Sequence, residues 1–161
     1  MTCMDCGAAV KVRHNQTVAY DFGGLPDVSL KGIDVRVCAN GHQEYVILGI
    51  EGLHKAIAFA LARKDSRLIP TEIKFMRKYL GFSQVDLAQR MGVTPESVSR
   101  WESGSIMMAP TAERLLRLAV LSIDPVPDYR ALDLFAKLKS KRAPAKMRLT
   151  RRANKWQAAA A

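Results

Sequence analysis

The sequence predicts an α+β fold, with a small β unit at the N-terminus and a helical domain after it. Two changes of pattern carry this prediction. From residue 9 to about residue 50, apolar and polar residues alternate, as they do in half-buried strands. From residue 53 the apolar residues recur at helical spacing, and Gly or Pro separates the segments. We therefore expect a strand-rich part followed by a helix-rich part.

The strand-rich part is expected to be a small antiparallel β unit. Alternation is clearest in Val10–Arg13 and in Ile33–Val37, and the breakers Gly23-Gly24-Leu25-Pro26 fall between these runs. A unit of about 50 residues is marginal for a hydrophobic core that has no metal or disulfide to support it. The β unit should therefore need a further source of stability.

The helix-rich part contains several short helices. An apolar stripe over Leu53–Arg63 indicates a first helix, and the polar residues up to Arg67 resemble a hinge. The next expected helices are Thr71–Leu80, Ser83–Met91, Thr94–Glu102, Thr111–Ser122 and Asp128–Leu138. The predicted organisation is a β domain (1–51), a helical linker (52–69), a helical domain (70–138) and a basic C-terminal arm (139–161).

The positive charge of the chain is concentrated near its C-terminus. The formal net charge is +10, and residues 130–161 hold ten Lys or Arg and one acidic residue. The arm is expected to be extended or frayed, and its cations could follow DNA phosphates while Trp156 packs or stacks, although a solvated tail is the alternative. The chain has neither a long apolar run nor the pattern of a secretory signal, so we expect a cytoplasmic protein without membrane association.

Residues 83–102 carry the strongest functional pattern, that of a helix-turn-helix. Ala88 is small where two helices would cross, Gly92 can adopt the positive φ of the turn, and Val98 would fill the angle between the helices. Ser83 with Asp86 resembles a capping box for the first of these helices. The alternative is an ordinary helical hairpin in an unrelated helical domain.

The second helix of this pair has its own start signal. Thr94 can cap the helix, and Pro95 suits its first turn. The segment ends in Arg100-Trp101-Glu102-Ser103-Gly104, and over residues 70–122 the chain resembles the Xre/Cro-repressor family. The resemblance implies a lambda-repressor-like fold with this second helix in the major groove of double-stranded DNA. The DNA-contacting positions that it implies are Gln84, Thr94, Pro95, Glu96, Ser97, Ser99 and Arg100.

The side chains agree with this assignment. Arg100 can donate two hydrogen bonds to guanine, and Glu96 can accept one from cytosine. The alternatives are a solvated or phosphate-binding Arg100 and a Glu96 that only complements the helix dipole. Glu102 is expected to have a structural role, for example in an ion pair with Arg77.

The three cysteines point to a structural zinc site in the β unit. Cys3-x-x-Cys6 can present two thiolates from one turn, and Cys38 with His42 can supply a second pair of ligands. His14 is an alternative fourth ligand, whereas His54 is expected to be a surface or packing residue. A redox-active pair, a metal-free remnant of a ribbon and a buried core cysteine are the other interpretations.

An N-terminal Cys-x-x-Cys-Gly, a β unit, a second cysteine-containing turn and an Xre-type helix-turn-helix together resemble the MqsA/YgiT-type antitoxins. The resemblance implies a zinc-ribbon-like domain that binds a toxin protein, and a homodimer that represses its own operator. The second turn departs from that family, because Cys38 is followed by Gly41-His42 and not by a second cysteine.

The predicted function is therefore that of an autoregulating repressor, and a stand-alone regulator with a structural or metal- or redox-responsive zinc site is the alternative. We expect no enzymatic activity, because the sequence has no catalytic motif and four protein ligands leave zinc no open position. One recognition helix buries too little surface for high specificity, which predicts a dimer. The expected dimer contact is the apolar stripe of Leu132, Phe135 and Leu138.

Overall fold

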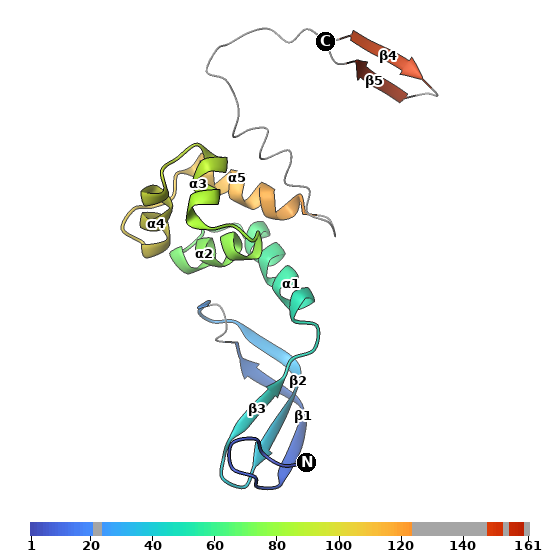
Figure 1. Cartoon of the computed structure of the whole chain (residues 1–161), viewed down its shortest axis with the longest axis vertical. Helices are drawn as coiled ribbons and strands as arrows, with labels where there is room; N and C mark the ends of the chain where they lie inside the picture. Colours follow the sequence, from blue (N-terminus) through green and yellow to red (C-terminus); the bar gives the residue numbers. More distant parts are fainter. Residues whose placement is uncertain (21–23, 124–147, 153–154, 160–161) are drawn as a thin grey trace.

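The computed structural model describes residues 1–20, 24–123, 148–152 and 155–159, and it confirms the α+β fold class (Figure 1). The expected helix over residues 128–138 and much of the basic arm lie outside the described residues. The described elements are β1 (Val10–Ala19), β2 (Ser29–Cys38), β3 (Gln43–Val46), α1 (Ile50–Arg63), α2 (Pro70–Tyr79), α3 (Gln84–Met91), α4 (Pro95–Ser103), α5 (Pro110–Leu121), β4 (Arg148–Arg152) and β5 (Lys155–Ala159).

The N-terminal sheet is antiparallel, with strand order β1-β2-β3. The long β1–β2 hairpin pairs Val10 with Cys38 at one end and Ala19 with Ser29 at the other. A bulge near Asn15, whose φ is 55°, interrupts the register, and Asp34 of β2 accepts a hydrogen bond from the Asn15 N–H at 3.4 Å. Figure 1 shows the N-terminus at the end of this sheet that is farthest from the helices.

The helical domain is built around a continuous apolar core. Val98, Leu116, Val120 and Met76 are fully buried, and they come from α4, α5 and α2. The pattern i, i+3, i+4 of these helices places their apolar residues on one side. The core thereby fixes α3 and α4 against α2 and α5.

The first helix belongs to this core and does not stand apart from it. Ala58 and Ala62 of α1 are buried in the same cluster as Leu116. The polar segment after α1, in which the sequence suggested a hinge, is held by Arg117 of α5, which donates to the carbonyl oxygens of Lys64 at 2.5 Å and Ser66 at 2.6 Å.

A buried carboxylate strengthens the same junction. The Glu113 side chain accepts hydrogen bonds from Arg67 and Arg117 at 2.5 Å and 2.7 Å and from the Leu68 N–H at 3.1 Å. Burial raises the pKa of Glu113, but these hydrogen bonds outweigh it, so the pKa lies below its ordinary value. Residues 64–68 are thus a tied connection between α1 and α2.

The C-terminal region contains two strands where an extended or frayed arm was expected. β4 and β5 pair antiparallel from Arg148 with Ala159 to Arg152 with Lys155. Closely spaced strands can pair locally without a distant partner. No helix among the described residues is long and apolar enough to cross a membrane.

Candidate metal centre and DNA-binding surface

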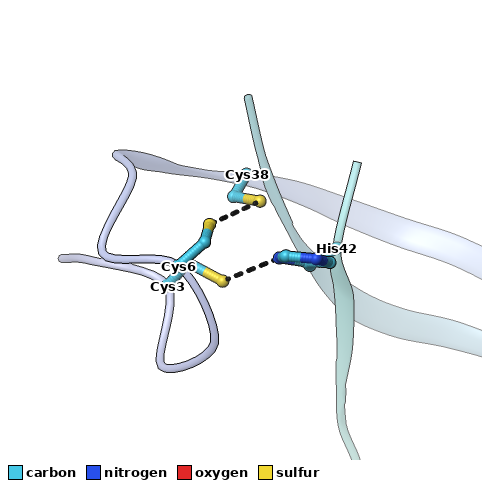
Figure 2. A group of neighbouring side chains, drawn as sticks. All are labelled: Cys3, Cys6, Cys38 and His42. Atoms are coloured by element: carbon cyan, nitrogen blue, oxygen red, sulfur yellow. Dashed lines mark hydrogen bonds between the residues drawn. The ribbon is translucent and has the colours of Figure 1, made fainter. Parts of the chain in front are cut away.

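The first two cysteines lie on a tight turn at the N-terminus. The Gly7 N–H donates to the Cys3 carbonyl at 2.9 Å, and the Cys3 N–H donates to the Ala8 carbonyl at 2.8 Å. These backbone bonds close the loop, so the side chains of Cys3 and Cys6 leave it on the same side (Figure 2). The turn thereby presents two sulfur atoms together.

The second pair of candidate ligands lies on the turn between β2 and β3. The Cys38 N–H donates to the His42 carbonyl at 3.1 Å, and the Gly41 N–H donates to the Cys38 carbonyl at 3.0 Å. Gly41 has a φ of 84°, a backbone conformation that glycine adopts readily and other residues rarely adopt. This turn takes the place of a second Cys-x-x-Cys and brings an imidazole to the site.

The four predicted ligands meet at one point. The sulfur atoms of Cys3, Cys6 and Cys38 and a ring nitrogen of His42 all lie within 4.8 Å of one another. Figure 2 marks two of the separations, 3.7 Å between Cys6 Sγ and Cys38 Sγ and 3.6 Å between Cys3 Sγ and His42 Nδ1. The topology brings together residues from both ends of the β unit's sequence.

Two of the six separations between these four atoms match those of a tetrahedral zinc site, and all six lie within 4.8 Å. With Zn–S bonds of about 2.3 Å and Zn–N bonds of about 2.0 Å, tetrahedral angles require about 3.8 Å between two sulfurs and about 3.5 Å between sulfur and nitrogen. The observed separations of 3.7 Å and 3.6 Å agree with both. Three sulfurs and one imidazole nitrogen form a ligand set typical of structural zinc.

Local hydrogen bonding prepares one of the thiols for a metal. The backbone N–H of Ala8 lowers the pKa of the Cys6 thiol to about 6, and the Asn40 side chain contributes in the same direction. The thiolate is the form that binds metal, and a lowered pKa makes it abundant at neutral pH. Cys38 is buried, whereas Cys6 and His42 are exposed, so the site lies at the surface with one ligand in the interior.

The alternative ligand His14 lies outside this group. Its Nδ1 is 2.9 Å from an Asp34 carboxylate oxygen at the β1 bulge, and the cluster does not include it. His54 is a packing residue, as expected, and lies between Tyr20 and Phe75.

The predicted helix-turn-helix forms as α3, a tight turn and α4. Gly92 has a φ of 66°, and its N–H donates to the Gln89 carbonyl at 3.4 Å, which confirms its role in the turn. Ser83 and Asp86 form the predicted capping box, with the Asp86 N–H donating to Ser83 Oγ at 3.0 Å. Thr94 caps α4 by accepting from the Ser97 N–H at 3.3 Å.

A polar contact fixes the orientation of α4. Arg77 of α2 donates to both oxygens of Glu102 in the last turn of α4, at 2.5 Å and 3.0 Å, as the sequence predicted. Gln84 of α3 donates to the same carboxylate at 2.9 Å. Three helices are therefore joined at one largely buried ion pair, and Val98 and Trp101 of α4 are buried in the core.

The opposite face of α4 is exposed. Pro95, Glu96, Ser99 and Arg100 are all solvent-accessible, as a base-reading surface requires. The pKa of Glu96 is lowered by its own backbone N–H, then by the Thr94 hydroxyl, with a smaller contribution from the charge of Arg100. Glu96 is thus an acceptor held at the start of the helix, one turn before a cationic donor.

The remaining predicted DNA-contacting residues are Thr94, Ser97 and Gln84, and each of them has a hydrogen-bonding partner within the protein. Thr94 is exposed, and Ser97 is half-buried with its hydroxyl 3.2 Å from that of Thr94. The side-chain amide of Gln84, expected to face phosphate, donates to Glu102 in this structure. This contact links a predicted phosphate-binding residue to the recognition helix, and the sequence alone did not indicate it.

Comparison with known proteins identifies the helical domain. A family model described as helix-turn-helix matches residues 73–121, from Ile73 in α2 to the end of α5. Comparison with curated proteins and with solved structures gave no significant match. The chain therefore carries an Xre/Cro-type helix-turn-helix domain, a type that binds DNA sequence-specifically, behind a three-stranded sheet whose cysteine–histidine cluster could hold a metal such as zinc.

Proposed function

We propose that this protein is a transcriptional repressor that reads its operator with α4 and uses the sheet to bind a partner protein. The exposed base-reading face of α4 on a capped and buttressed helix carries the DNA-binding part of this proposal. Arg100 and Glu96 lie one turn apart, a spacing that suits contacts to neighbouring base pairs of the major groove. A bound dimer would block transcription by occupying the promoter.

Selection of binding sites from random DNA duplexes tests the DNA-binding part. Arg100→Ala should weaken binding to the selected site by about 1–3 kcal/mol and relax its sequence preference at one base pair. Arg114→Ala on α5 is the matched control, because it removes another exposed arginine at a position outside the predicted interface. Equal losses in both variants would contradict base recognition by Arg100.

We propose that the repressor binds as a homodimer. Two recognition helices about one DNA turn apart supply the surface that specific binding needs. The predicted dimer contact at Leu132, Phe135 and Leu138 lies outside the described residues. Phe135→Glu should give a monomer by native mass with weaker operator binding, and an unchanged dimer would exclude this contact.

Zinc in the sheet is proposed to be structural, and the partner is proposed to be the toxin of an antitoxin–toxin pair. The sheet unit and its connection to α1 leave large apolar side chains at the surface, with Met4 95%, Leu48 87% and Tyr45 40% exposed. A protein partner that binds the sheet unit would cover these exposed apolar side chains. Co-expression with the neighbouring genes should give a stable complex through the sheet, and a lone dimer would favour the stand-alone regulator.

A second candidate function is a metal- or redox-responsive regulator. Cys6 Sγ and Cys38 Sγ are 3.7 Å apart, so a small movement could join them in a disulfide. Peroxide would be the oxidant: it takes the two thiol hydrogens and is reduced to water, and the disulfide would release the metal. Loss of operator binding with peroxide and its recovery with a thiol reductant would support this function. Operator binding that neither peroxide nor the reductant changes would exclude a redox-responsive regulator.

A further inference from the structure

The end of the sheet opposite the cysteines is buried in the helical domain. Tyr20, which directly follows β1, is only 2% exposed, and Leu25 is 5% exposed. Leu25 belongs to the same apolar cluster as Ala58 of α1 and Ile73 of α2, with Val28 packed against it. The β1–β2 hairpin thus contributes to the helical core with one end and to the metal centre with the other.

A polar contact crosses this junction. Tyr20 Oη lies 2.6 Å from His54 Nε2 of α1, and their rings meet edge to face with centroids 6.3 Å apart. The His54 ring in turn meets Phe75 of α2 at 5.8 Å and 89°. His54 is therefore held between a residue of the sheet and a residue of the helix-turn-helix domain.

Helix α2 connects Phe75 to the contact that holds α4. Phe75 and Arg77 lie on the same helix, α2, two positions apart. Arg77 holds Glu102 in the last turn of α4 with two hydrogen bonds. The backbone of α2 therefore links the Tyr20–His54–Phe75 contacts to the Arg77–Glu102 ion pair, and through that pair to α4.

We propose that Tyr20, His54 and Phe75 form an interdomain latch that couples the metal centre to the recognition helix. The hairpin strands are ten residues long, about 30 Å, so the cysteine cluster and the latch are the two ends of one ribbon. Loss of metal frees the cysteine end of the β1–β2 hairpin. Tyr20, at the other end of the hairpin, is then no longer held firmly against His54. The helices that support α4 become easier to open, and operator affinity falls.

This coupling rests on the proposed metal centre and DNA binding, and it works in both directions. If zinc raises operator affinity by some factor, operator DNA must raise zinc affinity by the same factor. The tests below therefore change the latch residues themselves.

Hydrogen exchange of the full chain provides the first test. Zinc-loaded protein and protein treated with EDTA are compared, with zinc content measured on each sample. In the wild type, metal removal should speed exchange in α1 and α2 by about fivefold, the effect of losing about one hydrogen bond, and not in the sheet alone. Tyr20→Phe, which keeps the ring and removes the hydroxyl, should confine the effect to the sheet.

His14→Gln is the matched control. It removes an exposed histidine–aspartate contact from the same hairpin and should leave the transmitted effect as in the wild type. The latch is overturned if α1 and α2 exchange is indifferent to zinc in the wild type, or if Tyr20→Phe transmits as the wild type does. If the chain holds no zinc, the metal proposal fails. The latch is then tested by the Tyr20→Phe variant alone: faster hydrogen exchange in α2 than in the wild type supports it, and unchanged exchange overturns it.

Operator binding gives a second readout that a purely structural role would not change. On a duplex selected from random sequences, wild-type affinity should fall when zinc is removed. The Tyr20→Phe variant should still bind the duplex, but its affinity should be nearly independent of zinc. An equal zinc dependence in the two proteins would overturn the latch while leaving DNA recognition intact.

Discussion

The sheet and the helical domain are stabilised in different ways. Among the described residues, sixteen of the twenty buried apolar side chains lie in residues 50–123 and only four precede them. Of those four, Leu25 belongs to the helical core and Cys38 to the cysteine cluster. Burial of apolar side chains therefore accounts for the stability of the helical domain. The sheet has almost no apolar core of its own.

The difference indicates how a small unit can be stable beside a larger one. The sheet is anchored at both ends, by a candidate metal site at one and by the helical core at the other. Structural metal supplies folding free energy that a unit of this size cannot obtain from burial. Substitutions at either end of the sheet or in the helical core can separate these two sources of stability.

Removal of the metal should have the largest effect. Cys38→Ser is expected to abolish zinc binding and disorder the sheet, because a structural zinc site contributes on the order of 10 kcal/mol. The helical domain should keep its helical circular dichroism, since most of its core side chains come from its own helices. Zinc analysis and two-dimensional NMR check both parts. A folded sheet in the metal-free variant would show that the hairpin needs no metal.

Breaking the buried ion pair should destabilise only the helical domain. Glu102→Ala leaves Arg77 buried without its carboxylate partner and should cost about 3–5 kcal/mol in urea unfolding. The double variant Arg77→Met, Glu102→Leu should recover much of that loss. Zinc content should stay unchanged in both, and a loss below about 1 kcal/mol for the single variant would mean that the pair is not well desolvated.

Shortening a core side chain should lower the free energy of unfolding by as much as breaking the ion pair, or by less. Leu116→Ala empties a fully buried position of α5 and should cost about 2–5 kcal/mol. Leu118→Ala on the same helix is the control, because Leu118 is 60% exposed and its loss should stay within about 0.5 kcal/mol. Similar losses at the two positions would indicate that Leu118 is covered by another surface in solution.

Acid should weaken the helical domain gradually through Glu113. Its folded pKa lies below the unfolded value of 4.5, so its contribution is full above that pH and disappears as the pH falls through the folded pKa. Glu113→Gln should make the melting temperature less dependent on pH in the acid range, and it should lower the stability at neutral pH. An unchanged acid profile would assign the pH dependence to other carboxylates.

The helix-turn-helix could be predicted from the sequence almost residue by residue. Its caps at Ser83 and Thr94 and its turn at Gly92 are local signals, and four of the helices begin and end within one residue of the expected positions. The Arg77–Glu102 pair was also predictable, because the helix-turn-helix geometry brings the two helices together. Local propensity and tertiary packing favour the same structure here, so the local signals suffice to specify it.

The arrangement of the cysteines was predictable in part. Cys3 and Cys6 are close in sequence, so a turn had to bring them together, and Cys38 with His42 forms a second such turn. The choice of His42 over His14 depended on the register of β1 against β2 and on the bulge at Asn15. Neither the register nor the bulge has a clear signal in this sequence.

By itself the sequence determined the order of the two parts, the helix-turn-helix and the types of residue available for metal and DNA. These features depend on contacts within a few turns of chain, where periodicity, caps and glycines act directly. The tertiary structure decided that residues 64–68 are tied and not a hinge, that Gln84 binds Glu102, and that Tyr20 meets His54. Such contacts join residues far apart in sequence, and only the packing of whole elements brings them into reach.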